Sequence, residues 1–132
     1  MRSVKPMRHA DVQNWLDDYI AAWAGNDADA IGALFAEDAV YSYRPWESDD
    51  QTVRGRDAIV ESWLEEPDDP TSWAAEYEPY AVDGDRAVAV GWSRYAPHDG
   101  HPERLYHNAY LLRFDGDGRC VEFREFYMRR DD

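Results

Sequence analysis

Three side chains that can move protons or hold charge fall in neighbouring strand-like segments of this sequence: Arg94, His107 and Glu125. An imidazole and a carboxylate act as general acids and bases, and a nearby guanidinium keeps a carboxylate charged. If all three side chains faced the same side of the sheet, they would form a polar floor in which Arg94 and His107 are the partners of Glu125. The same three residues can also form a satisfied internal network without a catalytic role.

Other reactive patterns are weak. The segment His98-Asp99-Gly100-His101 offers two imidazoles, but it lies in a turn without a third ligand, so a polar loop is favoured over a metal site. There is no Gly-rich phosphate loop and no nucleophile elbow, and Arg119 is the only basic neighbour of Cys120 in the sequence. We therefore expect no metal, no cofactor and no covalent mechanism.

Apolar spacing predicts three helices before the strand-rich part of the chain. Asp11 is the candidate N-cap of the first helix, Gly25 and Asn26 end it, Asp27 caps the second, and Pro67 follows the third. The apolar stripes of the three helices are Val12, Trp15, Leu16, Tyr19, Ile20 and Trp23; Ile31, Leu34 and Phe35; and Ile59, Val60, Trp63 and Leu64.

Strand signals dominate the rest. A short strand is expected at residues 39–43, and after the third helix the period changes to two. The later strands are expected at residues 73–82, 87–95, 104–114 and 120–128, with turns at 83–85 and 115–118. This order predicts an α+β fold in a single domain of residues 9–129, preceded by a loose segment of residues 1–8.

Charge and cysteine content limit the partners and the compartment. The chain has 28 acidic and 14 basic side chains, a formal net charge of -14, which would repel a phosphate backbone, so we expect no nucleic-acid partner. No apolar stretch approaches the length of a membrane span. The single cysteine, Cys120, cannot form an internal disulfide, which fits a cytoplasmic location.

Four short motifs occur in a characteristic order along the chain. They are Asp18-Tyr19-Ile20, Leu34-Phe35-Ala36-Glu37-Asp38-Ala39-Val40, Gly55-Arg56-Asp57-Ala58-Ile59 and Leu112-Arg113-Phe114-Asp115-Gly116-Asp117-Gly118-Arg119. Over residues 9–129 the chain resembles the nuclear transport factor 2-like (NTF2-like) superfamily, and within it the SnoaL-like proteins. The resemblance implies a cone-shaped, cystatin-like fold with three N-terminal helices on a curved mixed, mostly antiparallel sheet around one pocket. It implies no particular reaction, because the superfamily includes isomerases, dehydratases, cyclases, epoxide hydrolases and non-catalytic binders.

The resemblance also implies positions for site residues. His107 falls where isomerase relatives carry an acid that donates to the substrate oxyanion, Tyr19 matches their oxyanion tyrosine, and Tyr43 stands in place of their catalytic carboxylate. If His107 faces inward, strand alternation makes the inner face Val88, Val90, Trp92 and Arg94; Leu105, Ala109 and Leu111; and Phe123, Glu125 and Tyr127. The aromatic wall of the pocket is then expected from Tyr19, Trp23, Tyr41, Tyr43, Trp63, Trp92 and Tyr127.

Tyr43 argues against ketosteroid-type isomerisation, because a phenol with a pKa near 10 is a poor base. The set is more similar to the dehydratase branch, in which Tyr19 and Tyr43 would polarise a carbonyl and His107 would be the base, tuned by Glu125 or Arg94. We expect a small, mostly apolar, polyketide- or steroid-like carbonyl ligand and dehydratase, isomerase or cyclase chemistry. A non-catalytic ligand-binding or dimerisation module is the alternative.

The outer face of the sheet is expected to be apolar. The same alternation turns Tyr106, Tyr110, Leu112 and Phe126 outward. An exposed patch of this kind on a monomer predicts a homodimer formed through the outer face of the sheet.

Overall fold

The computed structural model describes residues 6–43, 52–65, 67–97 and 100–130, with only the backbone of Tyr43. The expected loose segment at residues 1–8 therefore lies largely outside the described residues, as does the His98-Asp99 pair. The elements, in chain order, are α1 (His9–Gly25), α2 (Ala28–Leu34), β1 (Phe35–Tyr43), β2 (Thr52–Arg54), α3 (Arg56–Glu65), β3 (Trp73–Asp83), β4 (Arg86–Tyr95), β5 (Arg104–Phe114) and β6 (Cys120–Arg129).

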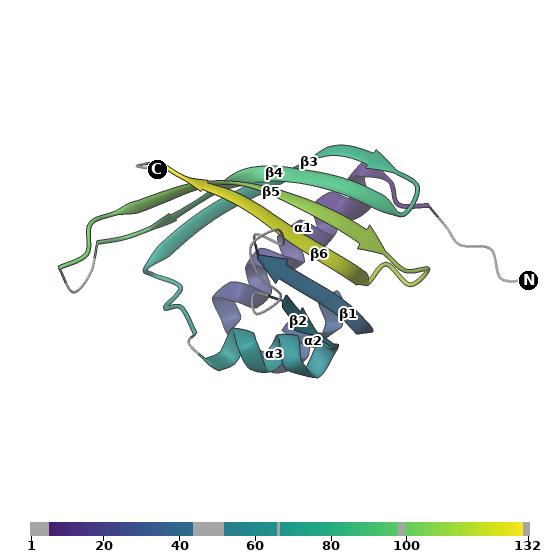
Figure 1. The fold of residues 1–132 in the computed structure, drawn as a ribbon, viewed down its shortest axis with the longest axis horizontal. Helices are drawn as coiled ribbons and strands as arrows, with labels where there is room; N and C mark the ends of the chain where they lie inside the picture. Colours follow the sequence, from purple (N-terminus) through teal and green to yellow (C-terminus); the bar gives the residue numbers. More distant parts are fainter. Residues whose placement is uncertain (1–5, 44–51, 66, 98–99, 131–132) are drawn as a thin grey trace, which may run out of the picture.

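The strands form one mixed sheet in the order β2-β1-β6-β5-β4-β3. β1 and β6 pair in parallel, and the other neighbours pair antiparallel. Figure 1 shows the long strands β3 to β6 arching over α1, with α2 and α3 further below the same side of the sheet. The α+β fold expected from the sequence is confirmed.

Helix ends agree with the sequence in two places and differ in one. Asp27 caps α2, accepting from Asp29 N at 2.9 Å, and α1 ends at Gly25 with Asn26 in the left-handed region at φ 49°. The expectation that Asp11 is the N-cap of α1 is wrong, because the helix begins at His9 after Arg8. The Asp11 carboxylate still serves the helix start, since it accepts from Arg8 N at 2.9 Å.

The inner face of the sheet differs from the expectation on two strands. On β4 and β5 the buried residues are Ala87, Ala89 and Ser93, and Asn108, Tyr110, Leu112 and Phe114. The register therefore turns Val88, Val90, Trp92 and Arg94 of β4, and Leu105, His107, Ala109 and Leu111 of β5, to the outer face. The predicted alternation on these strands was wrong by one residue. The prediction took His107 as an inward-facing anchor, but His107 is exposed on the outer face, and because both faces of β4 and β5 carry apolar residues the pattern itself did not correct the anchor.

Small residues of β4 make room for aromatic rings of the neighbouring strands. Gly91 pairs with Tyr77 of β3, and a Cβ at Gly91 would collide with Glu76 O and the Tyr77 ring and lie 2.8 Å from Tyr77 Cα. Glycine at position 91 thus allows β3 to approach β4 closely. The side chain of Tyr77 is 3% exposed. The aromatic rings of β3 and β5 fill the inner face where β4 is small.

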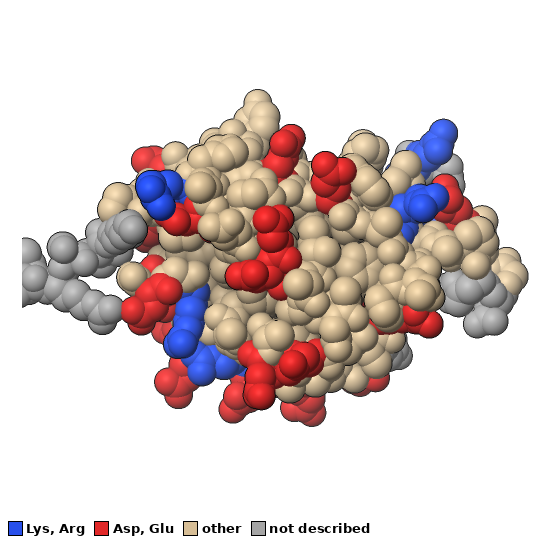
Figure 2. Space-filling view, turned by 180° about the vertical axis from the view of Figure 1, so that it is seen from behind, with Lys and Arg blue, Asp and Glu red and all other residues tan. Residues whose placement is uncertain are grey.

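On the surface seen from behind (Figure 2), most of the charged side chains are acidic. Figure 2 shows red acidic groups spread over this face and blue basic groups only toward its two ends. The helices of the described residues include none long and apolar enough to cross a membrane.

Candidate functional site

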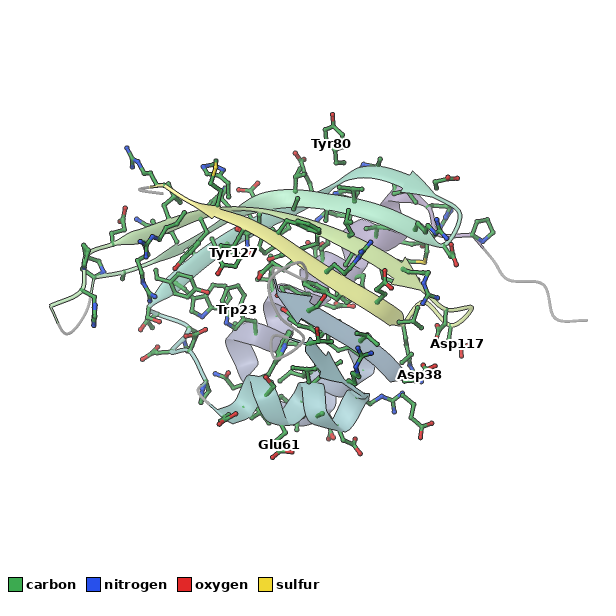
Figure 3. All side chains as sticks on the ribbon, viewed as in Figure 1. Trp23, Asp38, Glu61, Tyr80, Asp117 and Tyr127 are labelled. Carbon is green, nitrogen blue, oxygen red and sulfur yellow. The ribbon has the colours of Figure 1, made fainter. Side chains whose placement is uncertain are left out.

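A cavity of about 230 Å³ lies between the inner face of the sheet and helices α1 and α3. Aromatic rings and a few polar groups line it, contributed by seven helices and strands and by two connecting segments. Its lining residues are Tyr19, Trp23, Asn26, Tyr41, Ser62, Trp63, Asp68, Tyr77, Ser93, Tyr95, Asn108, Tyr110 and Glu125. In Figure 3, Trp23 lies below the sheet on this inner side, whereas Tyr80 projects from the opposite side.

Asp68 connects two segments of the chain at one end of the cavity by hydrogen bonds. Trp23 Nε1 donates to Asp68 Oδ2 at 3.0 Å, and Asn26 Nδ2 donates to Asp68 O at 3.1 Å. The Trp23 ring also stacks on Trp73 with 3.7 Å between centroids. These contacts join the end of α1 to the segment between α3 and β3, so the wall is fixed by hydrogen bonds as well as by packing.

Glu125 is the titratable group that distinguishes this cavity. It lies on β6, where its register partners are Tyr110 of β5 and the backbone of Tyr43 of β1. The side chain is partly buried, and this desolvation raises the pKa of Glu125 to about 7. At neutral pH the carboxyl group is therefore divided between its two protonation states, as suits a group that accepts and returns a proton.

Phenol groups surround this carboxyl. Tyr19 and Tyr41 bring their hydroxyl oxygens to 3.4 Å from one another, and burial raises the pKa of Tyr77 to about 12 and that of Tyr110 well above its ordinary value. The charge of Glu125 contributes to both of these shifts. Tyr77 and Tyr110 therefore remain protonated at neutral pH and can act as hydrogen-bond donors.

Asn108 holds the phenols of two strands together. Its Nδ2 donates to Tyr110 Oη at 3.2 Å and to Tyr77 Oη at 3.5 Å. The side chain is 9% exposed, and its Oδ1 is buried with no hydrogen-bond partner among the residues that the structure describes. A buried acceptor without a donor is costly, so this atom is a place where a ligand could contribute a donor.

An adjoining hollow of about 410 Å³ continues past Glu125 toward the ends of β5 and β6. It shares Glu125, Asn108 and Asp68 with the cavity and adds a basic group, Arg104. The Arg104 guanidinium carbon lies 5.0 Å from the centroid of the Tyr95 ring. Its full lining is Asp68, Ser93, Tyr95, Arg104, Tyr106, Asn108, Glu125 and Tyr127.

The structure separates the predicted triad of Arg94, His107 and Glu125. His107 is exposed on the outer face of β5, and Arg94 is exposed on β4 with its Nη1 3.4 Å from Glu103 Oε2. The expected polar floor is therefore wrong, because strand alternation puts these two side chains on the face opposite to Glu125. His107 has no access to a ligand in the cavity.

The other predicted site residues are divided among several positions. Tyr19, Trp23, Tyr41, Trp63 and Glu125 line the cavity, and Tyr127 lines the adjoining hollow. Phe123 is fully buried behind the cavity, where it stacks on Tyr41 with 4.3 Å between centroids. Val90 and Trp92 lie on the outer face, and the side chain of Tyr43 is outside the described residues.

Sequence reasoning missed several lining residues: Asn26, Ser62, Asp68, Tyr77, Ser93, Tyr95, Asn108 and Tyr110. Two signals could have found those on β4 and β5. Phe114 is the last apolar residue before the turn, and counting back from it in steps of two gives Tyr110 and Asn108. Gly91 marks a place on β4 where another residue approaches the backbone closely.

The arrangement can support acid-base chemistry and hydrogen bonding to a small molecule. One carboxyl group can exchange a proton, and neutral phenols can stabilise a developing negative charge. Within the described ranges, no group of three His, Cys, Asp or Glu side chains is placed to hold a metal ion. Burial raises the pKa of the Cys120 thiol far above its ordinary value, so this cysteine is a core residue and not a nucleophile.

Helices packed inside a curved, mixed six-stranded sheet around one cavity define an NTF2-like, cystatin-like α+β cone. A family model described as the SnoaL-like domain matches residues 16–123. The chain belongs to this SnoaL-like family. A comparison with curated proteins finds no match.

Solved structures of several kinds share the fold. A putative isomerase from Bacillus subtilis has 15% identity and a TM-score of 0.72, with 92% of this chain and 90% of that chain covered. An LEH-like epoxide hydrolase from M. tuberculosis has 14% identity and a TM-score of 0.65, with 91% and 84% covered. A hypothetical protein with a ketosteroid isomerase-like fold from Catenulispora acidiphila, in complex with trimethylamine, has 22% identity and a TM-score of 0.64, with 86% and 84% covered. At these identities the likeness is one of fold.

Proposed function

We propose that this SnoaL-like protein binds a small carbonyl compound in the cavity and moves a proton on it with Glu125, as a cofactor-independent isomerase or lyase. The observation that carries the proposal is the Glu125 carboxyl on the cavity wall with a pKa of about 7. A base of this pKa near neutral pH combines a populated carboxylate with useful basicity. Glu125 thus takes the role that the sequence had given to His107.

Neutral phenols support the same chemistry. Removing a proton beside a carbonyl puts negative charge on the carbonyl oxygen, and donors that remain protonated stabilise that charge. Tyr77 and Tyr110 meet this requirement because burial raises the pKa of both hydroxyls. Tyr19, on α1, is a further candidate donor in the same cavity.

The size of the cavity favours a small ligand. Pockets for drug-sized molecules start at about 300 Å³, and this cavity measures about 230 Å³. A one-ring or two-ring carbonyl compound, such as a fragment of polyketide type, is therefore favoured over a steroid. The putative isomerase and the trimethylamine complex among the structural neighbours support isomerisation or small-molecule binding as general roles for this fold.

Hydrogen-deuterium exchange at the carbon beside a ketone tests the proposal. We expect the protein in deuterated buffer to accelerate exchange into cyclohexanone, measured by proton NMR, and Glu125→Gln to remove the acceleration. Glu61→Gln is the matched control, because Glu61 is an exposed carboxylate on α3 outside the cavity. Equal exchange rates with the protein, with Glu125→Gln and with buffer alone would exclude proton transfer between the protein and this class of ketone.

A non-catalytic binding module is the second candidate. The observation that favours it is that polar groups of the wall already contact one another, as do the hydroxyls of Tyr19 and Tyr41 at 3.4 Å. Saturable binding of cyclohexanone without exchange would support this alternative.

We also propose that the protein forms a homodimer through the outer face of the sheet, in the cytoplasm. The reason differs from the sequence argument, because Tyr106, Tyr110 and Leu112 face inward. The outer face nevertheless has an apolar group, Val88, Val90, Trp92, Leu105, Leu111 and Phe126 on neighbouring strands, although Arg94, His107 and Arg124 lie on the same face. The lone cysteine, Cys120, supports the location.

A further inference from the structure

The cavity has an unbalanced charge. Two carboxyl groups, Glu125 and Asp68, belong to its wall, and no Lys, Arg or His is among the described residues that line it. The pKa of Glu125 is raised by desolvation, and Arg104, the basic residue among the described residues of the adjoining hollow, lies over the Tyr95 ring. A buried carboxylate is stable only when it is protonated or paired, and a ligand with positive charge would provide the missing pair.

Aromatic rings make up about half of the wall, and their faces attract cations. The rings are those of Tyr19, Trp23, Tyr41, Trp63, Tyr77, Tyr95 and Tyr110. A ring face attracts an ammonium or guanidinium group within about 6 Å of its centroid, most strongly where water is excluded. The wall already shows this interaction once, because the Arg104 guanidinium lies 5.0 Å from the Tyr95 centroid in the adjoining hollow.

The wall also contains a hydrogen-bond acceptor that has no donor among the described residues. Asn108 Oδ1 is a pure acceptor, the side chain is nine-tenths buried, and no described residue donates to the atom. Its own Nδ2 is directed to Tyr110 and Tyr77, so the amide is held in place. An N–H of a charged amine would satisfy this oxygen, and a carbonyl oxygen of a neutral ligand would not.

From these three features we infer that the ligand of this cavity carries a protonated amine, held between the Glu125 carboxylate, the aromatic rings and Asn108 Oδ1. The inference rests on the ligand site of the proposed function and adds the charge of the ligand. Any carbonyl group on which Glu125 acts then belongs to a molecule that also bears an ammonium group. The acidic surface of Figure 2 and the net charge of -14 would attract such a ligand from solution.

Binding of a cation must be linked to the ionisation of Glu125. The titratable or charged groups around this carboxyl are Tyr19 on α1, Tyr41 on β1, Asp68 before β3, Tyr77 on β3, Tyr95 on β4, Arg104, Tyr106 and Tyr110 on β5, and Tyr127 on β6. Glu125 titrates near neutral pH, whereas the pKa values of Tyr77, Tyr95 and Tyr110 are raised away from it. A bound cation favours the carboxylate, so binding releases the proton of Glu125 and affinity increases about tenfold between about pH 6 and about pH 8.

Calorimetric titration with two six-membered rings tests the inference. Piperidinium is a cation with N–H donors, and cyclohexanone is a neutral carbonyl compound of similar size. We expect tighter binding of piperidinium, with proton release detected as a dependence of the measured heat on the ionisation enthalpy of the buffer. Glu125→Gln should weaken piperidinium binding by about tenfold or more, and Glu61→Gln, which removes the same charge from the exposed side of α3, should leave it unchanged.

Each outcome bears on the charge of the ligand separately from catalysis. Piperidinium binding that weakens in Glu125→Gln supports the inference even where no exchange into cyclohexanone occurs. The inference is overturned if cyclohexanone binds as tightly as piperidinium, or if piperidinium binds as tightly at about pH 6 as at about pH 8. Either result leaves the proposed proton transfer intact. Asp68→Asn is a second test variant, because its amide oxygen can still accept from Trp23 Nε1. We expect it to weaken piperidinium binding as well. The test therefore does not depend on the folding of a single variant. N,N-dimethylpiperidinium binding as tightly as piperidinium would overturn the role of Asn108.

Discussion

Tyr110 and Glu125 are opposite one another in the antiparallel register of β5 and β6, and the charge of the carboxylate contributes to the raised pKa of the phenol. Both side chains face the cavity. The pair thus places a proton acceptor beside a hydroxyl that stays protonated. The described residues that line the cavity include no basic residue. A change in the protonation of Glu125 therefore changes the net charge of the site.

Replacing Glu125 by Gln should stabilise the protein at neutral pH. The folded-state pKa is about 7 against an ordinary value of 4.5, so the native state binds the proton more tightly and loses stability as pH rises from about 4.5 to about 7. The full loss is about 3 kcal/mol. Because the amide does not titrate, the advantage of Glu125→Gln should grow across this window, as urea unfolding at several pH values can measure. A constant difference, equal to that of Glu61→Gln, would show that Glu125 is solvated.

Replacing Gly91 by Ala should destabilise the fold by about 2 kcal/mol or more, because the new methyl group would collide with Glu76 O and the Tyr77 ring. Tyr77 would have to move, and the cavity would change shape with it. Gly25→Ala is a suitable control, since a Cβ there meets no atom within 4 Å. Equal unfolding midpoints for the two variants would contradict the close approach of β3 to β4.

Replacing Leu111 by Arg should convert a dimer into a monomer, because Leu111 lies on the apolar outer face at the centre of the sheet. Sedimentation equilibrium at micromolar concentration measures the change. Ala21→Arg, on the exposed side of α1, adds the same side chain away from the sheet and should leave the dimer intact. A monomeric unsubstituted protein would remove the dimer proposal.

Adding sodium chloride should raise the melting temperature between low and moderate ionic strength. At a net charge of -14 the folded chain repels itself, and screening reduces this repulsion. A thermal melt followed by circular dichroism across a salt series measures the effect. A melting temperature independent of salt would show that the acidic groups are too far apart to matter.

The fold was largely predictable because helix spacing and turn residues act locally. The first helix ended at Gly25 and Asn26 as expected, and the hairpin turns fell between the expected strands. The strand β2 was missed because it has only three residues, Thr52–Arg54, and its pairing with β1 leaves no pattern in so short a segment.

The site was less predictable, because a shift of one residue turns a whole strand over. On β6 the predicted alternation of Phe123, Glu125 and Tyr127 was correct, because these side chains lie on the cavity side whereas Arg124 is exposed. On β4 the larger residues, such as Val90 and Trp92, cover the outer face, and alanine and glycine leave the inner space to rings of β3 and β5. Apolar residues thus occupy both faces of β4, and the inward position assigned to His107 turned the prediction to the wrong face.

The central position of β6 also affects how the chain must fold. Synthesis supplies residues 120–129 after every other strand, yet these residues lie between β1 and β5 in the sheet. Until they arrive, a nascent chain has open hydrogen-bonding edges on both sides of a gap, and open edges invite pairing with other chains. The wall that carries Glu125 is then the last to close, so partly synthesised or C-terminally shortened chains would expose their aromatic interior to chaperones and to each other.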